Sequence, residues 1–142
     1  MRRVSMVIAI CFVLALTLSL MGQARTLDTI MKEIQPVWAT PATGLNANLN
    51  SASPDYAKMA QDAAKLEALF KEAEGEFNKL KMTAAAGMAK TSSEAAAKLA
   101  AEAKGGKVAD AKAHQAALNT CKGCHNQYRE PDPAGGFKVK AQ

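Results

Sequence analysis

The sequence predicts an all-α protein folded as an antiparallel up-down-up-down four-helix bundle. Residues 25–142 contain 27 alanines but only five valines or isoleucines. Alanine is the strongest helix former, whereas strands favour β-branched residues. Apolar residues also recur in several stretches at steps of three and four, which is the period of one helix face. Four such helices with short connections account for the length of this region.

Residues 1–24 are predicted to be a secretory signal peptide rather than part of the bundle. Two arginines precede an apolar run from Val4 to Leu20, and small residues stand at Gly22 and Ala24, the positions that signal peptidase reads. We expect cleavage after Ala24 and export to the periplasm, which leaves a chain without a membrane span. The alternative is a retained membrane anchor, because the run approaches the ~20 residues that a span needs.

The first helix is predicted to begin at Thr26, whose hydroxyl suits an N-cap. Apolar residues follow at the i, i+3, i+4 and i+7 spacing of one helix face. They are Leu27, Ile30, Met31 and Ile34. Pro36 is expected to bend or end this helix, because proline lacks the N–H that a helix interior needs. Residues 40–53 are rich in Asn, Ser and Thr and predict a loop.

The second helix is predicted to start with Ser53 as N-cap and Pro54 in the first helical position, where a missing N–H costs little. An apolar stripe then recurs at alternating steps of three and four, as in the seam of an antiparallel bundle. Its members are Tyr56, Met59, Ala63, Leu66, Phe70, Ala73, Phe77 and Leu80. The helix is expected to end within residues 75–82.

The third helix is alanine-rich and is predicted to run to about Lys104, where Gly105-Gly106 forms a C-terminal stop. Thr91 and Glu94 resemble a capping box, so a restart of this helix after Gly87 is an alternative.

The fourth helix is predicted from about Val108 to Glu130 and is ended by Pro131. The remaining residues, 132–142, hold two clusters of proline or glycine. We expect them to form a loose tail of the domain that spans residues 25–142.

The charge of the exported chain is only mildly basic. Residues 25–142 carry 16 basic and 13 acidic residues, a formal charge of +3. No basic run is interleaved with aromatic residues, so nucleic-acid binding is not expected. No pattern resembles a paired acid and base or a nucleophile with its base, so an enzyme is not expected either.

The last predicted helix carries Cys121-Lys122-Gly123-Cys124-His125, the C-x-x-C-H attachment sequence of c-type haem. Two thiols three residues apart can each bond one of two neighbouring vinyl groups, and the next residue is then placed to bind the iron. Covalent haem attachment in bacteria takes place on exported chains, which agrees with the signal peptide. The sequence therefore predicts one covalent haem c on Cys121 and Cys124, with His125 as the proximal iron ligand.

Three other uses of these cysteines compete. One is a Cys121–Cys124 disulfide in a haem-free helical module. Another is a thioredoxin-like redox pair, which normally opens a helix after a strand, and no strand is expected here. The third is a zinc site completed by His114. On one unbroken helix His114 and Cys121 lie ~10 Å apart, too far for zinc bonds of about 2.0–2.3 Å, so His114 is expected on the bundle face or the surface.

A C-x-x-C-H motif on the last helix of a four-helix bundle resembles the class II cytochromes c, the cytochrome c′ family. The resemblance covers residues 26–130, and the stretch from Glu94 through Arg129 is similar to the family's third and fourth helices. Tyr128 and Arg129 match a Phe/Tyr–Arg/Lys pair that follows the histidine in the family. The resemblance implies that Arg129 lies beside the proximal histidine, near the haem with Tyr128. A cation at the C-terminal end of a helix is an equal explanation for Arg129.

The resemblance leaves the sixth iron position open. In some members a methionine from the first helix binds the iron and the protein transfers electrons. In others the iron is five-coordinate and binds small gases such as NO or CO. Met31 stands where that methionine would be, and a thioether opposite histidine raises the reduction potential. Met31 is also explained as core packing, since methionine fills gaps in protein interiors.

Our first hypothesis is a periplasmic mono-haem electron carrier with His125 proximal, Met31 distal and redox proteins as partners. The second is a five-coordinate, gas-binding cytochrome c′. The haem pocket is expected to draw on core residues of three helices: Leu27, Ile30, Ile34, Leu66, Phe70, Leu118 and Tyr128. Relatives often dimerise through their first two helices, so a homodimer is an option, with a contact supplied by Trp38, Tyr56 or Met59.

Overall fold

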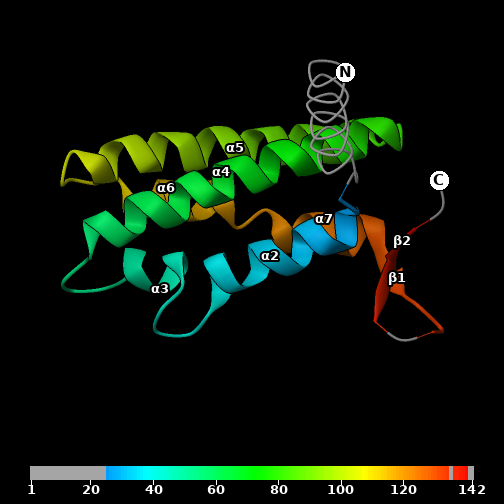
Figure 1. Cartoon of the computed structure of the whole chain (residues 1–142), viewed down its shortest axis with the longest axis horizontal. Coiled ribbons are helices and arrows are strands. Elements are labelled where there is room, and N and C mark those ends of the chain that lie inside the picture. The colour runs from blue at the N-terminus through cyan, green and yellow to red at the C-terminus, as the bar shows by residue number, and fades with distance from the viewer. Residues whose placement is uncertain (1–24, 135, 141–142) are drawn as a thin grey trace, which may run out of the picture.

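Two long helices, α4 (Tyr56–Lys79) and α5 (Thr83–Lys104), lie side by side along the molecule (Figure 1). The turn between them is tight because Lys81 has a positive φ of 59°. The N–H of Lys81 bonds to the carbonyl of Asn78 at 3.0 Å, and that of Met82 to the carbonyl of Phe77 at 2.9 Å. This Schellman geometry satisfies the last carbonyls of α4 and sends the chain back along it.

The structure is a computed structural model that describes residues 25–134 and 136–140. The signal peptide predicted over residues 1–24 lies outside these residues. The described chain is mostly helical, so the predicted all-α class is confirmed. None of the described helices is both long and apolar enough to cross a membrane.

The limits of α4 and α5 differ from prediction only at their first turns. Asp55, not Ser53, is the N-cap of α4, because the Asp55 carboxylate accepts a bond of 2.9 Å from the Lys58 N–H. Helix α5 runs without a restart through Thr91, whose hydroxyl donates to the Gly87 carbonyl at 3.1 Å instead of capping. The ends of both helices fall where the sequence predicts them.

Helix α2 (Leu27–Ala39) packs against α4 and begins at the predicted cap, where Thr26 accepts from the Thr29 N–H at 3.3 Å. Pro36 does not end it, so that part of the prediction is wrong, and the helix continues for three more residues. Thr40 then adopts an extended backbone, as a residue before proline prefers.

The predicted loop over residues 40–53 contains a short helix, α3 (Leu45–Leu49). Leu45 and Leu49 stand one turn apart and are both buried, which fixes this helix against the body of the molecule. The residue before this helix is Gly44, and the backbone leaves no room for a side chain there. A Cβ at this position would lie 2.8 Å from the Trp38 carbonyl oxygen and the Thr40 nitrogen.

The predicted fourth helix is broken in two. Helix α6 (Ala111–Leu118) is followed by a turn at Asn119 and Thr120, and α7 (Cys121–Tyr128) then carries the C-x-x-C-H motif. The prediction of one helix from Val108 to Glu130 is therefore wrong, and the helical stretch ends at Tyr128 rather than at Pro131.

Two short strands follow α7, the first at the end of the predicted fourth helix and the second in the tail that was expected to be loose. Strand β1 (Arg129–Pro131) pairs antiparallel with β2 (Phe137–Val139), with Glu130 opposite Lys138. Gly136, with a φ of 81°, helps the chain turn between them, and its carbonyl accepts from the Asp132 N–H. The Lys140 N–H donates to the Tyr128 carbonyl at 2.9 Å, which ties this hairpin to the end of α7.

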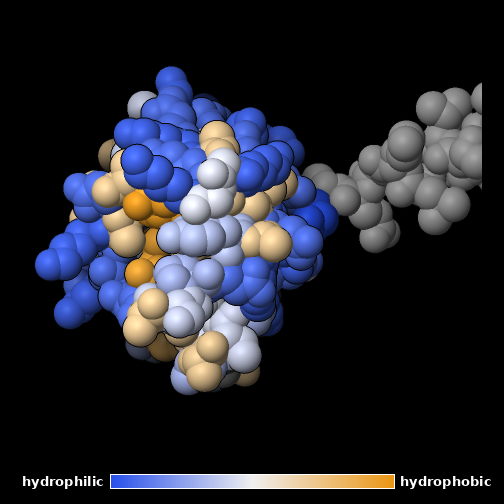
Figure 2. All heavy atoms as spheres, turned by 90° about the vertical axis from the view of Figure 1, so that its left-hand side faces the viewer, coloured by the Kyte–Doolittle hydropathy of each residue, from blue (hydrophilic) through white to orange (hydrophobic). Residues whose placement is uncertain are grey.

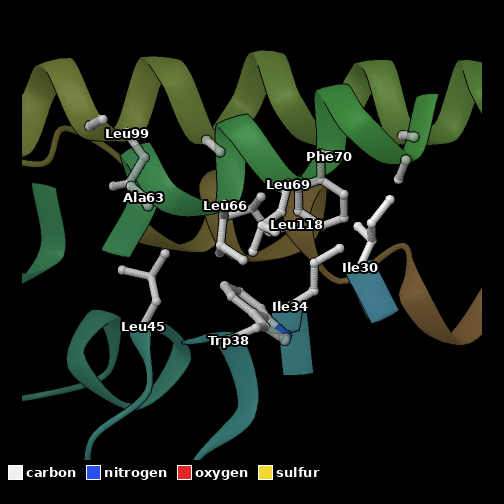
Figure 3. Packing of buried hydrophobic residues seen from close by; sticks show 14 of the residues in the cluster. Ile30, Ile34, Trp38, Leu45, Ala63, Leu66, Leu69, Phe70, Leu99 and Leu118 are labelled. Atoms are coloured by element: carbon white, nitrogen blue, oxygen red, sulfur yellow. The ribbon is translucent and has the colours of Figure 1, made fainter. Parts of the chain in front are cut away.

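The core gathers between α2, α4, α5 and α6. In Figure 3 side chains from these helices converge with one from α3: Ile30, Ile34, Trp38, Leu45, Leu66, Leu69, Phe70, Leu99 and Leu118. The end of the molecule on the left of Figure 1 is largely hydrophilic, with a smaller apolar area among the polar side chains (Figure 2). The C-x-x-C-H helix lies toward the other end.

Candidate functional site

Four helices contribute to a pocket of ≈ 340 Å³, a volume that includes space open to solvent. Its walls are almost wholly apolar, as is common for cofactor sites. The lining residues are Met31 of α2, Phe70 and Phe77 of α4, Ala85, Met88, Ala89 and Ser92 of α5, Thr120, and Cys121, Cys124 and His125 of α7.

The C-x-x-C-H motif forms one wall of this pocket. Residues 121, 124 and 125 are spaced i, i+3 and i+4, which places them on one face of α7. Both cysteines are free thiols, and Sγ of Cys121 points back to the Leu118 carbonyl at 3.7 Å. The structure thus brings together the three motif residues and Met31, all of which the sequence analysis had selected.

The pocket wall differs from the predicted one. Only Phe70 of the seven predicted wall residues lines the pocket. Five of the others are buried in the core and Leu27 is half-buried against it: Leu27, Ile30, Ile34, Leu66, Leu118 and Tyr128. Except for Leu118 of α6, they lie on helices that also line the pocket, but they pack in or against the hydrophobic core.

Sequence reasoning missed the α5 side of the pocket. Ala85, Met88, Ala89 and Ser92 follow the i, i+3, i+4, i+7 spacing of one helix face. That signal was present, but three of four residues on this face are small and α5 is rich in alanine on every side.

Burial sets the protonation of the motif. It raises the pKa of both the Cys121 and the Cys124 thiol, and the nearby Cys121 raises that of Cys124 further. Burial is the main cause that lowers the pKa of His125, and the positive charge of Arg129 lowers this pKa further. At neutral pH the thiols are therefore protonated and the imidazole is neutral, the form in which histidine binds a metal.

Arg129 acts on His125 from outside the pocket. Its guanidinium carbon lies 3.8 Å from the centroid of the Phe137 ring, so strand β2 holds it in a cation–π contact. Arg129 is exposed, whereas Tyr128 is buried in the core, and neither residue is among those that line the pocket.

One polar contact crosses the apolar wall. The hydroxyls of Ser92 on α5 and Thr120 before α7 lie 2.8 Å apart, and either can be the donor. This contact links the α5 wall of the pocket to the start of α7, the helix that carries the motif.

His114 has a different environment. It is buried on α6, and its Nε2 lies 3.0 Å from Oε2 of Glu102, which also accepts the Ala109 N–H at 3.0 Å. These contacts lower the pKa of Glu102. Within residues 25–134 and 136–140, no three His, Cys, Asp or Glu side chains are grouped to hold a metal ion.

The residues suggested for a dimer contact are covered by their own chain. Trp38 and Met59 are buried, and Tyr56 is half-buried against the core. They serve as packing residues in the single chain.

The chain matches no protein-family model, no curated protein and no solved structure. Function is therefore inferred from the motif and the pocket that it lines.

Proposed function

We propose that this chain is a mono-haem c-type cytochrome that carries electrons in the periplasm. The observation that carries the proposal is the C-x-x-C-H motif on one face of α7, lining an apolar pocket. A covalent haem needs two thiols, an axial ligand and apolar walls, and this site has residues for each. Cys121 and Cys124 would hold the haem, and His125 would bind its iron.

The donor chemistry of the site suits this group. The His125 imidazole is neutral near pH 7, because burial and Arg129 lower its pKa. The thioether of Met31, which lines the same pocket from α2, would be the second donor. When bound, the haem supplies a one-electron redox change, while the protein provides attachment, ligands and a dry environment.

The proposed fold is the class II cytochrome bundle in up-down-up-down order. Helices α2, α4 and α5 would be its first three members, and α6 with α7 would together be the fourth. Residues 1–24 would be removed during export, and redox proteins would be the partners.

A gas-binding cytochrome c′ is the second candidate. Phe70, Phe77 and Ala85 give the pocket an apolar wall, and Met31 also packs against the core cluster. If Met31 serves only as packing, the protein would leave room for NO or CO beside a haem held by Cys121, Cys124 and His125.

The test is expression of the whole chain with haem-attachment machinery, followed by extraction in denaturant. We expect haem to stay on the wild type and on the His114→Ala control. We expect it to be lost from the Cys121→Ala, Cys124→Ala double variant and to show altered ligation in His125→Ala. A wild type that loses its colour in denaturant, or a double variant that keeps it, contradicts the proposal.

Reduced and CO-treated spectra then separate the two candidates. Sharp low-spin bands that CO hardly changes support the electron carrier. Broad high-spin bands that shift at once with CO support the gas-binding protein.

A further inference from the structure

Ser92 on α5 is wholly buried, with 0% of its surface exposed, and its bond to Thr120 spans two segments far apart in the sequence. Both residues line the pocket, and Thr120 directly precedes Cys121. The bond therefore lies where the wall of the pocket meets the start of the attachment motif.

Thr120 occupies the N-cap position of α7 without capping it. Its backbone is already helical, with φ −70° and ψ −14°, and its side chain makes no bond to the N–H groups of α7. Thr26 shows the usual arrangement, with ψ 151° and a hydroxyl that accepts from the Thr29 N–H. A threonine at this position normally satisfies a free N–H of its own helix. The Thr120 hydroxyl bonds to Ser92 instead.

We propose that Ser92 is a positioning residue for the attachment motif, and this rests on the proposed haem attachment. Through Thr120 it fixes where α7 starts after the break from α6. Each residue turns a helix by ~100°, so a slip of one residue at this break would turn Cys121 and His125 away from the pocket. The hydroxyl pair thus sets which face of α7 the pocket receives.

The neighbouring serine is a matched control. Ser93 is also buried, but its hydroxyl donates to the Lys90 carbonyl of its own helix at 2.8 Å. Ser92→Ala and Ser93→Ala remove the same atom from adjacent positions of α5, yet only the first leaves Thr120 without its partner.

The first experiment measures amide hydrogen exchange in the whole chain without haem. We expect Ser92→Ala to speed exchange of residues 121–128 about 5- to 10-fold relative to α4, as the loss of one buried hydrogen bond implies. Ser93→Ala should leave that ratio of exchange rates unchanged. Ser92→Thr, which keeps a hydroxyl at this position, should show the wild-type ratio. Equal effects of the two alanine variants on residues 121–128 would overturn the proposal.

Thr120→Val removes the other partner of the same bond, so it tests the proposal even if Ser92→Ala folds poorly. It removes the hydroxyl at nearly constant volume and should reproduce the faster exchange of α7. The variant that combines Ser92→Ala with Thr120→Val should be no worse than either alone, because the two changes remove one bond. Additive effects would contradict the proposal.

The second experiment uses chains made with haem-attachment machinery. Ser92→Ala should lower the fraction of chain with covalent haem and shift the reduction potential of what is attached, while Ser93→Ala matches wild type. If wild type takes up no covalent haem, the proposed function fails, but the exchange ratios still decide whether Ser92 positions α7.

Discussion

Met31 on α2 and His125 on α7 line the same pocket, although the whole of α4 and α5 lies between them in the sequence. A methionine and a histidine are the axial ligands of many electron-transfer haems. The ligand role proposed for Met31 is therefore the first to test.

Met31→Ala is expected to convert the reduced haem protein from sharp low-spin bands to broad high-spin bands and to make it bind CO. Under the proposed function, the substitution would remove the sixth ligand, and this loss would also lower the reduction potential. The matched control is Met88→Ala, which removes a methionine from the α5 wall of the same pocket. If Met88→Ala gives this change and Met31→Ala does not, the ligand has been assigned to the wrong helix.

Arg129→Gln should raise the pKa of His125 only part of the way to its usual value. Burial is the larger cause of the lowered pKa, and it remains when the charge of Arg129 is removed. The measurement is an NMR titration of His125 in the haem-free chain. Lys138→Gln is the control, since it removes a cation of the same hairpin that pairs with Glu130 at 3.4 Å. A full return to the usual pKa would show that burial contributes little.

Glu102→Gln should weaken the dependence of stability on acid pH. The folded-state pKa of Glu102 is lowered by the Ala109 N–H and by His114, so its contribution is present above the unfolded pKa of about 4.5. It is lost as the pH falls through the folded pKa. We expect the urea midpoint of wild type to fall more steeply below pH 4.5 than that of Glu102→Gln. The exposed Glu94→Gln should follow wild type, and identical slopes for all three would refute this role for Glu102.

Leu66→Ala should cost about 2–5 kcal/mol in the free energy of unfolding. Leu66 is 0% exposed at the centre of the core, where its removal leaves a cavity (Figure 3). Leu80→Ala, at a position that is 53% exposed, should change stability by less than about 0.5 kcal/mol. Urea unfolding of the haem-free chain measures both, and similar losses would mean that the packing around Leu66 is loose.

The long helices could be predicted because their signals are repeated many times. The stripe of α4 recurs over its length, and Gly105-Gly106 marks the end of α5 unambiguously. Helix α3 and strands β1 and β2 were missed because three to five residues are too short to show a period.

The break before α7 could not be read from the sequence, because Asn119 and Thr120 are tolerated in helices. The partner of the Thr120 hydroxyl is Ser92, a residue of another helix, and local sequence does not predict such a contact. The motif itself indicated which residues of α7 line the pocket, whereas the α5 wall depends on which side of an alanine-rich helix faces inward. Local sequence does not specify that choice.

The hairpin of α4 and α5 has a consequence for the order of folding. Its two helices are adjacent in the sequence and lie side by side, so they can pair after closing only a tight turn at Lys81. Contacts of this local kind form quickly, since little chain entropy is lost before they are made. We expect α4 and α5 to pair early and to serve as the surface on which α2 and α7 dock later. The motif would then acquire its pocket only in the last, slower phase of folding.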